Sequence, residues 1–173
     1  MNKKLEEIRK MITENVWLFW DTNTWKHEEK KRFKDEGLLP FEWDGKSRIA
    51  FIAENPSEGK MTGNLLNFKR YLDKNGLSGS FVTDLIKRKG EQPKDNLFWS
   101  TRDAEILKKE IDLVKPHFIV AVGRSAEKIL RHEDYDLGVP VEKIRHYSRT
   151  KKDDVQADIK RIARILRKRM KGV

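Results

Sequence analysis

Short apolar runs alternate along the chain with longer stretches in which apolar side chains recur every three or four residues. The short runs predict β-strands at residues 48–53, 80–86, 117–122 and 141–147. The longer stretches predict helices at residues 63–74, 101–114, 125–131 and 153–171. Strands that alternate with helices favour a parallel sheet covered on both faces. The pattern therefore predicts an α/β domain, a three-layer αβα sandwich around a central, mainly parallel four-stranded sheet.

The first 47 residues have a different pattern. They contain four of the five tryptophans, and their charged stretches predict a helix near residues 3–15 and a second one that ends at residue 34. We expect residues 1–47 to form a helical, Trp-rich extension that packs on the core. The α/β domain is then expected to span residues 48–173.

Length and composition exclude several classes of protein. The chain has 173 residues, which suits one ordinary domain, and it contains no cysteine, so disulfides, Cys-ligated metals and a Cys nucleophile are excluded. Its four histidines are scattered, and it lacks a Walker loop, a Gly-rich dinucleotide motif and a nucleophile elbow. We therefore expect neither a cofactor nor a metal. Without a signal peptide or an apolar window near eighteen residues, we expect a cytoplasmic protein with no membrane contact.

Positive charge is concentrated near the C-terminus. Residues 143–173 contain twelve Lys and Arg but only three Asp, a net charge of +9 out of the +10 of the whole chain. Such a basic segment is typical of a surface that binds a polyanion, and nucleic acid is favoured over membrane because no Trp or Phe interrupts the basic face. The same charges also fit a solubilising helix face. Charge alone does not choose between these interpretations.

Polar side chains lie at the end of each predicted strand. Glu54 follows the first strand, Arg124 follows the third, and His146 lies near the end of the fourth. Parallel sheets bind ligands at the carboxyl ends of their strands, although each of these residues also fits an ordinary turn or loop. Asp84 is more informative, because a carboxylate in an apolar strand needs a ligand or an ion-pair partner such as Lys87 or Arg124.

Four segments carry a more specific pattern: IAFIAENPSEG (residues 49–59), SFVTDLIKRKG (80–90), DLVKPHFIVAVGRSAEKIL (112–130) and IRHYSR (144–149). In order and spacing they resemble the motifs of the uracil-DNA glycosylase superfamily, from about residue 49 to residue 166. The first is similar to G-E-x-P-G or G-x-N-P-G, and the third to L-x-P-x-x-I-V-A-L-G-R-x-A-x-x-x-L. The last falls where members carry H-P-S. Four motifs in the same order are a far more specific signal than any one of them.

The resemblance implies the fold of that family and a role in DNA repair, the removal of a deaminated base after it is flipped out of the duplex. Asn55 falls at the position that orients or activates the attacking water, and His146 at the position that stabilises negative charge on the departing base. Asp84 falls where the family reads the edge of the base, with Glu54 implied to bind the same base. The positions implied to bind DNA are Ser57, Lys87, Arg124, Ser125, Ser148, Arg149, Lys151 and Lys152.

Three features depart from the family pattern. Asp84 replaces an Asn, and an ionised carboxylate only accepts hydrogen bonds, so uracil, hypoxanthine and xanthine all stay open as the base. Tyr147 replaces the expected Pro. The aromatic residue that stacks on the flipped base is not evident, and its candidates are Phe68, Phe98 and Trp99.

These observations lead to three hypotheses. The first is a monofunctional DNA glycosylase that uses water and no cofactor, acts as a monomer, and associates with the nucleoid when it is bound to DNA. The second is a catalytically inactive nucleic-acid-binding protein of the same fold. The third is a structural α/β domain whose basic tail contacts a protein partner.

Overall fold

The computed structural model describes residues 43–54, 63–85, 101–132 and 137–171, together with residues 3, 4 and 7. In this part of the chain, four strands form one sheet with the order β2-β1-β3-β4. Every neighbouring pair of strands is parallel, which confirms the predicted parallel sheet. The strands are β1 (Ile49–Ala53), β2 (Phe81–Asp84), β3 (Phe118–Val122) and β4 (Val141–Ile144).

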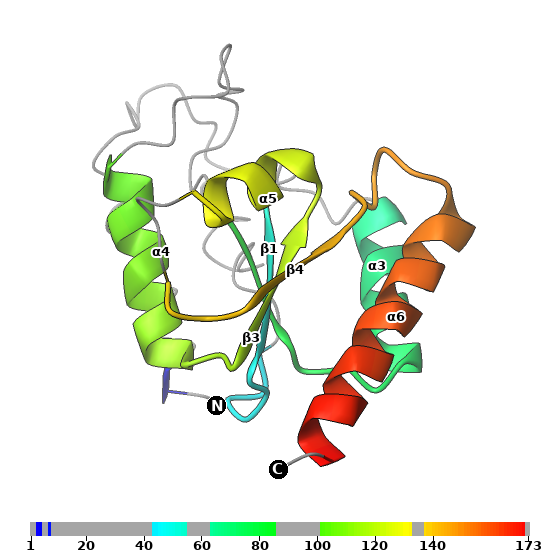
Figure 1. The fold of residues 1–173 in the computed structure, drawn as a ribbon, viewed down its shortest axis with the longest axis horizontal. Coiled ribbons are helices and arrows are strands. Elements are labelled where there is room, and N and C mark those ends of the chain that lie inside the picture. Colours follow the sequence, from blue (N-terminus) through cyan, green and yellow to red (C-terminus); the bar gives the residue numbers. More distant parts are fainter. Residues whose placement is uncertain are drawn as a thin grey trace, which may run out of the picture.

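Helices cover both faces of the sheet. Helices α4 and α5 pack on one face, and helices α3 and α6 pack on the other (Figure 1). Their bounds are α3 (Gly63–Lys74), α4 (Thr101–Val114), α5 (Arg124–Leu130) and α6 (Lys152–Lys171). The predicted three-layer αβα sandwich is confirmed, and the predicted helix bounds differ from these by no more than one residue.

Alternation of side chains along the strands divides the core into two clusters. Ala50 and Ile52 of β1 face α4 and α5, whereas Phe51 between them faces α3 and α6. Strand β3 is buried along its whole length, because both of its faces are covered. The two outer layers are thus held to the sheet by separate sets of apolar side chains.

One residue of the predicted N-terminal extension belongs to this core. Trp43 is buried on the α4 side, where its ring meets Phe81 edge-on with 6.0 Å between the ring centroids. Its Nε1–H also donates a hydrogen bond to the Ser47 carbonyl oxygen at 3.0 Å. Residues 3, 4 and 7 are helical, and the rest of the chain before Trp43 lies outside the described residues. The domain boundary at residue 47 stays a prediction.

Strand β4 is shorter than predicted. The prediction extended it to Tyr147, but its pairing with β3 ends at Ile144. The backbone N–H of Arg145 donates instead to Asp158 Oδ2 on α6, at 2.9 Å. The next residues form a turn, so His146 lies on a loop rather than in a strand. A carboxylate from the last helix therefore determines where this strand ends.

Candidate active site

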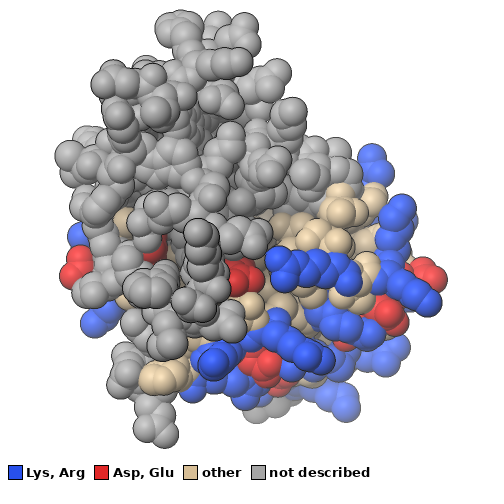
Figure 2. Space-filling model, turned by 90° about the horizontal axis from the view of Figure 1, so that it is seen from above, with Lys and Arg blue, Asp and Glu red and all other residues tan. Residues whose placement is uncertain are grey.

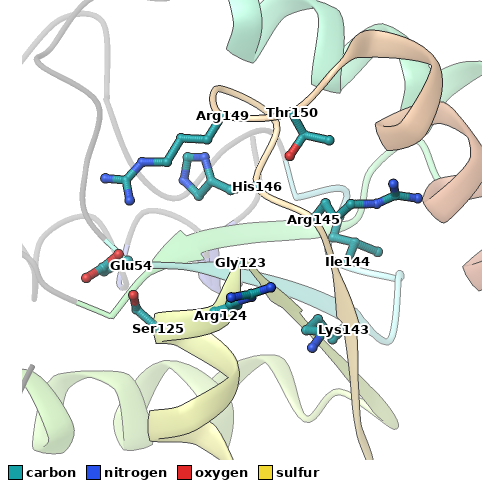
Figure 3. A pocket seen from close by; sticks show the side chains of 10 residues that line it. All are labelled: Glu54, Gly123, Arg124, Ser125, Lys143, Ile144, Arg145, His146, Arg149 and Thr150. Carbon is teal, nitrogen blue, oxygen red and sulfur yellow. The ribbon is translucent and has the colours of Figure 1, made fainter.

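A cavity of about 430 Å³ lies at the carboxyl ends of the strands (Figure 3). Parallel strands all end at the same edge of a sheet, so the segments that follow β1, β3 and β4 meet there. Most of the cavity wall comes from β4 and the loop after it, and from the start of α5. The lining residues are Glu54, Gly123, Arg124, Ser125, Lys143, Ile144, Arg145, His146, Arg149 and Thr150.

Gly123 allows the imidazole of His146 to approach the end of β3. Its φ of 97° and ψ of 168° belong to a backbone region that is almost restricted to glycine. A Cβ atom at this position would lie 3.3 Å from both Cβ and Cδ2 of His146. The missing side chain at Gly123 therefore makes room for the histidine ring.

Hydrogen bonds from Ser148 determine the tautomer of His146. The backbone N–H of Ser148 donates to Nδ1 at 3.2 Å, and the Ser148 hydroxyl lies 2.8 Å from the same nitrogen. A backbone N–H only donates, so Nδ1 is an acceptor and the single proton of the neutral imidazole is on Nε2. Figure 3 shows the ring pointing toward the side of the cavity where Glu54 and Arg149 lie. Among the described residues, no side chain or carbonyl accepts a hydrogen bond from Nε2.

The surroundings of His146 also favour its neutral form. Burial lowers the pKa of the imidazole below its usual 6.5, and the positive charge of Arg149 lowers it further. The carboxylate of Glu54 has a smaller, opposite effect on this pKa. At pH 7 the ring is therefore uncharged, and it presents an N–H donor rather than a positive charge.

Two of the four cations in the cavity wall are already paired. Lys143 Nζ lies 2.6 Å from Glu127 Oε2 on α5. Arg145 points away from the cavity toward α6, where its guanidinium pairs with two aspartates (Figure 3). Within the described residues, no ion pair engages Arg124 or Arg149. These two guanidinium groups are therefore the positive charges available to an anionic ligand.

Asp84 lies at the same edge of the sheet but in the α3 and α6 layer. It lies at the end of β2 and is 5% exposed. The hydroxyl of the preceding residue, Thr83, faces α4, so the side chain of Asp84 points to the opposite face of the sheet. Burial raises the pKa of the Tyr147 hydroxyl, and the negative charge of Asp84 raises it further. Among the described residues, Asp84 makes no ion pair with Arg124 and does not line the cavity. Its role in reading the base stays a prediction.

Phe68 is a core residue and does not have the suggested role of base-stacking aromatic. It is 1% exposed. Its ring stacks on Tyr147 with 4.9 Å between centroids and meets Phe51 edge-on at 5.7 Å. A base could reach this ring only if the close-packed core opened. The other two candidates, Phe98 and Trp99, lie outside the described residues.

The structure brings some of the predicted site residues together and separates others. Five of them line the cavity: Glu54, Arg124, Ser125, His146 and Arg149. Four are described but do not line it: Asp84, Ser148, Lys151 and Lys152. Three lie outside the described residues: Asn55, Ser57 and Lys87.

Sequence reasoning missed four residues of β4 and its loop that line the cavity: Lys143, Ile144, Arg145 and Thr150. Lys143 and Arg145 belong to the basic C-terminal segment, and Ile144 to the predicted strand at residues 141–147. All four lie within four residues of the predicted site residue His146, which is the signal that could have identified them.

No protein-family model matches this sequence, and no curated protein is significantly similar to it. Within the described residues, no three His, Asp or Glu side chains are arranged to hold a metal ion. No helix in the described part of the chain is long and apolar enough to cross a bilayer. Function is therefore inferred from the geometry of the cavity and from the motifs around it.

Proposed function

We propose that the protein is a DNA glycosylase of the uracil-DNA glycosylase type, which hydrolyses the N-glycosidic bond of a deaminated base. The observation that carries this proposal is the neutral His146 at the carboxyl end of the sheet, with its proton on Nε2. The motif resemblance assigns the same residue to the stabilisation of the departing base. The cavity of about 430 Å³ beside it is within the roughly 300–1,000 Å³ of small-ligand pockets.

The proposed chemistry follows the movement of charge. When the bond between the base nitrogen and C1′ of deoxyribose breaks, both bonding electrons leave with the base, and C1′ becomes oxocarbenium-like. A neutral imidazole that donates its Nε2–H to an oxygen of the base stabilises the negative charge without transferring a proton. Water then adds to C1′, oriented by Asn55 as the resemblance implies. The products are a free base, which gains the proton lost by the water, and an abasic site.

The charges around the cavity suit the backbone of DNA. Arg124 and Arg149 line the cavity, and Lys151 and Lys152 are exposed nearby, at the start of α6. Figure 2, which looks onto this end of the sheet, shows Lys and Arg side chains gathered over the described part of the face, with fewer Asp and Glu. Phosphates bind such groups without regard to sequence. These contacts would hold a DNA strand while the cavity receives one base.

Cleavage of labelled oligonucleotides tests the proposal. Each oligonucleotide carries one uracil, hypoxanthine or xanthine, either single-stranded or paired, and alkali then breaks the strand at any abasic site. We expect breakage at one of these bases, and a loss of about 10²–10³ in rate for His146→Ala. The variant His117→Ala is the control, because His117 is exposed at the opposite end of β3. An unchanged rate for His146→Ala, or no breakage by a protein that binds the same DNA, would contradict the proposal.

Binding of nucleic acid without catalysis is a second candidate function. Asp84 does not line the cavity, and Phe68 is not available to stack on a base. Both observations fit a site that has lost its chemistry. Such a protein would bind DNA with an affinity that falls steeply with salt, because phosphate contacts release counterions. It would leave all three bases in place under conditions in which it is saturated with DNA.

A further inference from the structure

Four aromatic rings connect the candidate site to the core. The imidazole of His146 stacks on Tyr147, with 4.8 Å between centroids and 26° between planes. Tyr147 also stacks on Phe68 of α3, with 4.9 Å and 25°. Phe68 meets Phe51 of β1 edge-on, at 5.7 Å and 82°. Because Phe51 and Phe68 are buried, the inner end of this row of rings is held by close packing.

The loop that carries His146 needs such support. It begins after β4 has stopped pairing with β3, so the backbone at His146 is held by a turn hydrogen bond, from the Arg149 N–H to the His146 carbonyl oxygen at 3.2 Å, rather than by strand pairing. Ser148 binds only Nδ1, on one edge of the ring, and Gly123 offers no side chain. The face of Tyr147 is the aromatic contact of this imidazole in the described part of the chain. A proline at this position would restrict the backbone but would offer no aromatic face.

We propose that Tyr147 is a positioning residue, whose ring fixes the orientation of the His146 imidazole by stacking between it and Phe68. In this orientation Nδ1 accepts from Ser148, and Nε2 keeps its proton for a ligand in the cavity. The catalytic consequence of this inference rests on the proposed function, but the ring geometry does not. The tyrosine that stands in place of the proline of the H-P-S motif would then serve the function of this chain, rather than mark the loss of that motif.

The charged groups around the two rings are compatible with this role. Burial and then the charge of Asp84 raise the pKa of the Tyr147 hydroxyl above its usual 10, so this ring is neutral at physiological pH. Among the described residues, Arg149 and Glu54 are the charged groups that act on His146, and that ring is also neutral at pH 7. The contact is therefore between two uncharged rings and does not depend on an ion pair.

Nitrogen-15 NMR of the His146 side chain tests the proposal without any need for turnover. In the wild-type protein we expect an unprotonated Nδ1, a protonated Nε2, and ring protons of His146 shifted upfield by the face of Tyr147. Tyr147→Leu should average the two nitrogen shifts and move the imidazole pKa toward about 6.5. Tyr147→Phe keeps the ring, so it should preserve the wild-type spectrum.

Tyr71→Leu is the matched control. Tyr71 is also a partly buried tyrosine against the same core cluster, but it has no described ring contact with His146. This variant should lower stability without changing the His146 spectrum. A wild-type spectrum in folded Tyr147→Leu, or an averaged one in Tyr147→Phe, would overturn the proposal. If Tyr147→Leu does not fold, the absence of upfield-shifted His146 protons in the wild-type protein would overturn it equally.

Kinetics separate this proposal from the proposed function. If the wild-type protein excises a base, kcat of Tyr147→Leu should fall by about a hundredfold with little change in KM, since a misplaced donor weakens transition-state contacts. An unchanged kcat in a variant with an averaged His146 spectrum would overturn the positioning role. If the wild-type protein excises no base, the proposed function fails, and the NMR result still decides whether Tyr147 orients His146.

Discussion

At the scale of single residues, the space for the His146 imidazole depends on the absence of a side chain at Gly123. Gly123→Ala should cost about 1–3 kcal/mol of unfolding free energy, because an L-residue is strained at this φ and ψ. Its Cβ should also push the imidazole, which lies 3.3 Å away, and so lower turnover in the folded variant. Urea unfolding and oligonucleotide cleavage measure the two effects.

Gly138→Ala is the control for this prediction. Gly138 also has a positive φ, 61°, but no atom of the described residues lies within 4 Å of the place where its Cβ would be. This variant should lose stability through backbone strain, by about 1–2 kcal/mol, while its turnover stays at the wild-type level. Equal turnover in both variants would mean that the contact between Gly123 and His146 has no functional consequence.

The pKa of His146 leads to a prediction about stability and pH. Burial and then the charge of Arg149 lower this pKa in the folded protein, and the charge of Glu54 has a smaller, opposite effect. The imidazole of His146 therefore binds a proton more readily in the unfolded chain than in the folded one. The stability that depends on neutral His146 is present above about pH 6.5 and is lost as pH falls below that value. Between pH 7.5 and pH 5, wild-type protein should therefore lose more unfolding free energy than His146→Gln. Chemical denaturation at the two pH values measures this difference, and equal losses would contradict the prediction.

At the scale of helices and strands, the elements that depend on burial alone could be predicted from the sequence. Strand β3 is a run of five apolar residues and is buried along its length. Helix α6 buries Val155, Ile159 and Ile162, which recur at helical spacing. The end of β4 could not be predicted, because Asp158, thirteen residues further along the chain, accepts the N–H of Arg145. An interaction of that kind depends on how α6 packs.

The same distinction applies to the candidate site. Glu54, Arg124 and His146 could be placed together because each follows a strand of one parallel sheet. The packing of Phe68 could not be predicted, since it results from Tyr147 and Phe51 on two other segments. The tautomer of His146 likewise depends on one backbone N–H in the turn. Sequence indicates which residues reach the edge of the sheet, and packing determines what each of them does there.

At the scale of the whole molecule, the positive charge of the C-terminal segment has two uses. Several arginines hold α6 in place: Arg145, in the loop before it, pairs with two aspartates of α6, Arg161 pairs with Glu142 of β4 at 3.3 Å, and the Arg169 guanidinium lies 4.9 Å from the ring centroid of Phe118. Other basic side chains have no such partner among the described residues. Only these would be free to meet phosphates.

Lys160, Arg164 and Lys168 are the clearest example of this second group. They are exposed and four residues apart on α6, so they form one stripe, and no ion pair engages them within the described residues. We expect DNA binding to weaken when all three of these residues are replaced by Gln. The slope of log affinity against log salt should become shallower by about 0.9 for each phosphate that the variant no longer neutralises, up to about 3 in total. A salt titration with duplex DNA measures the slope.

The matched control replaces three lysines on the other side of the sheet by Gln: Lys108, Lys109 and Lys115. These lysines are also exposed, and the change in net charge is the same. An equal decrease of slope in the two triple variants would mean that net charge alone attracts DNA, with no defined role for α6. A decrease confined to the α6 variant would mean that DNA runs along this helix as well as across the cavity. Cleavage at saturating DNA should then be unchanged in that variant, because the stripe is separate from His146 and acts on binding rather than on the bond that breaks.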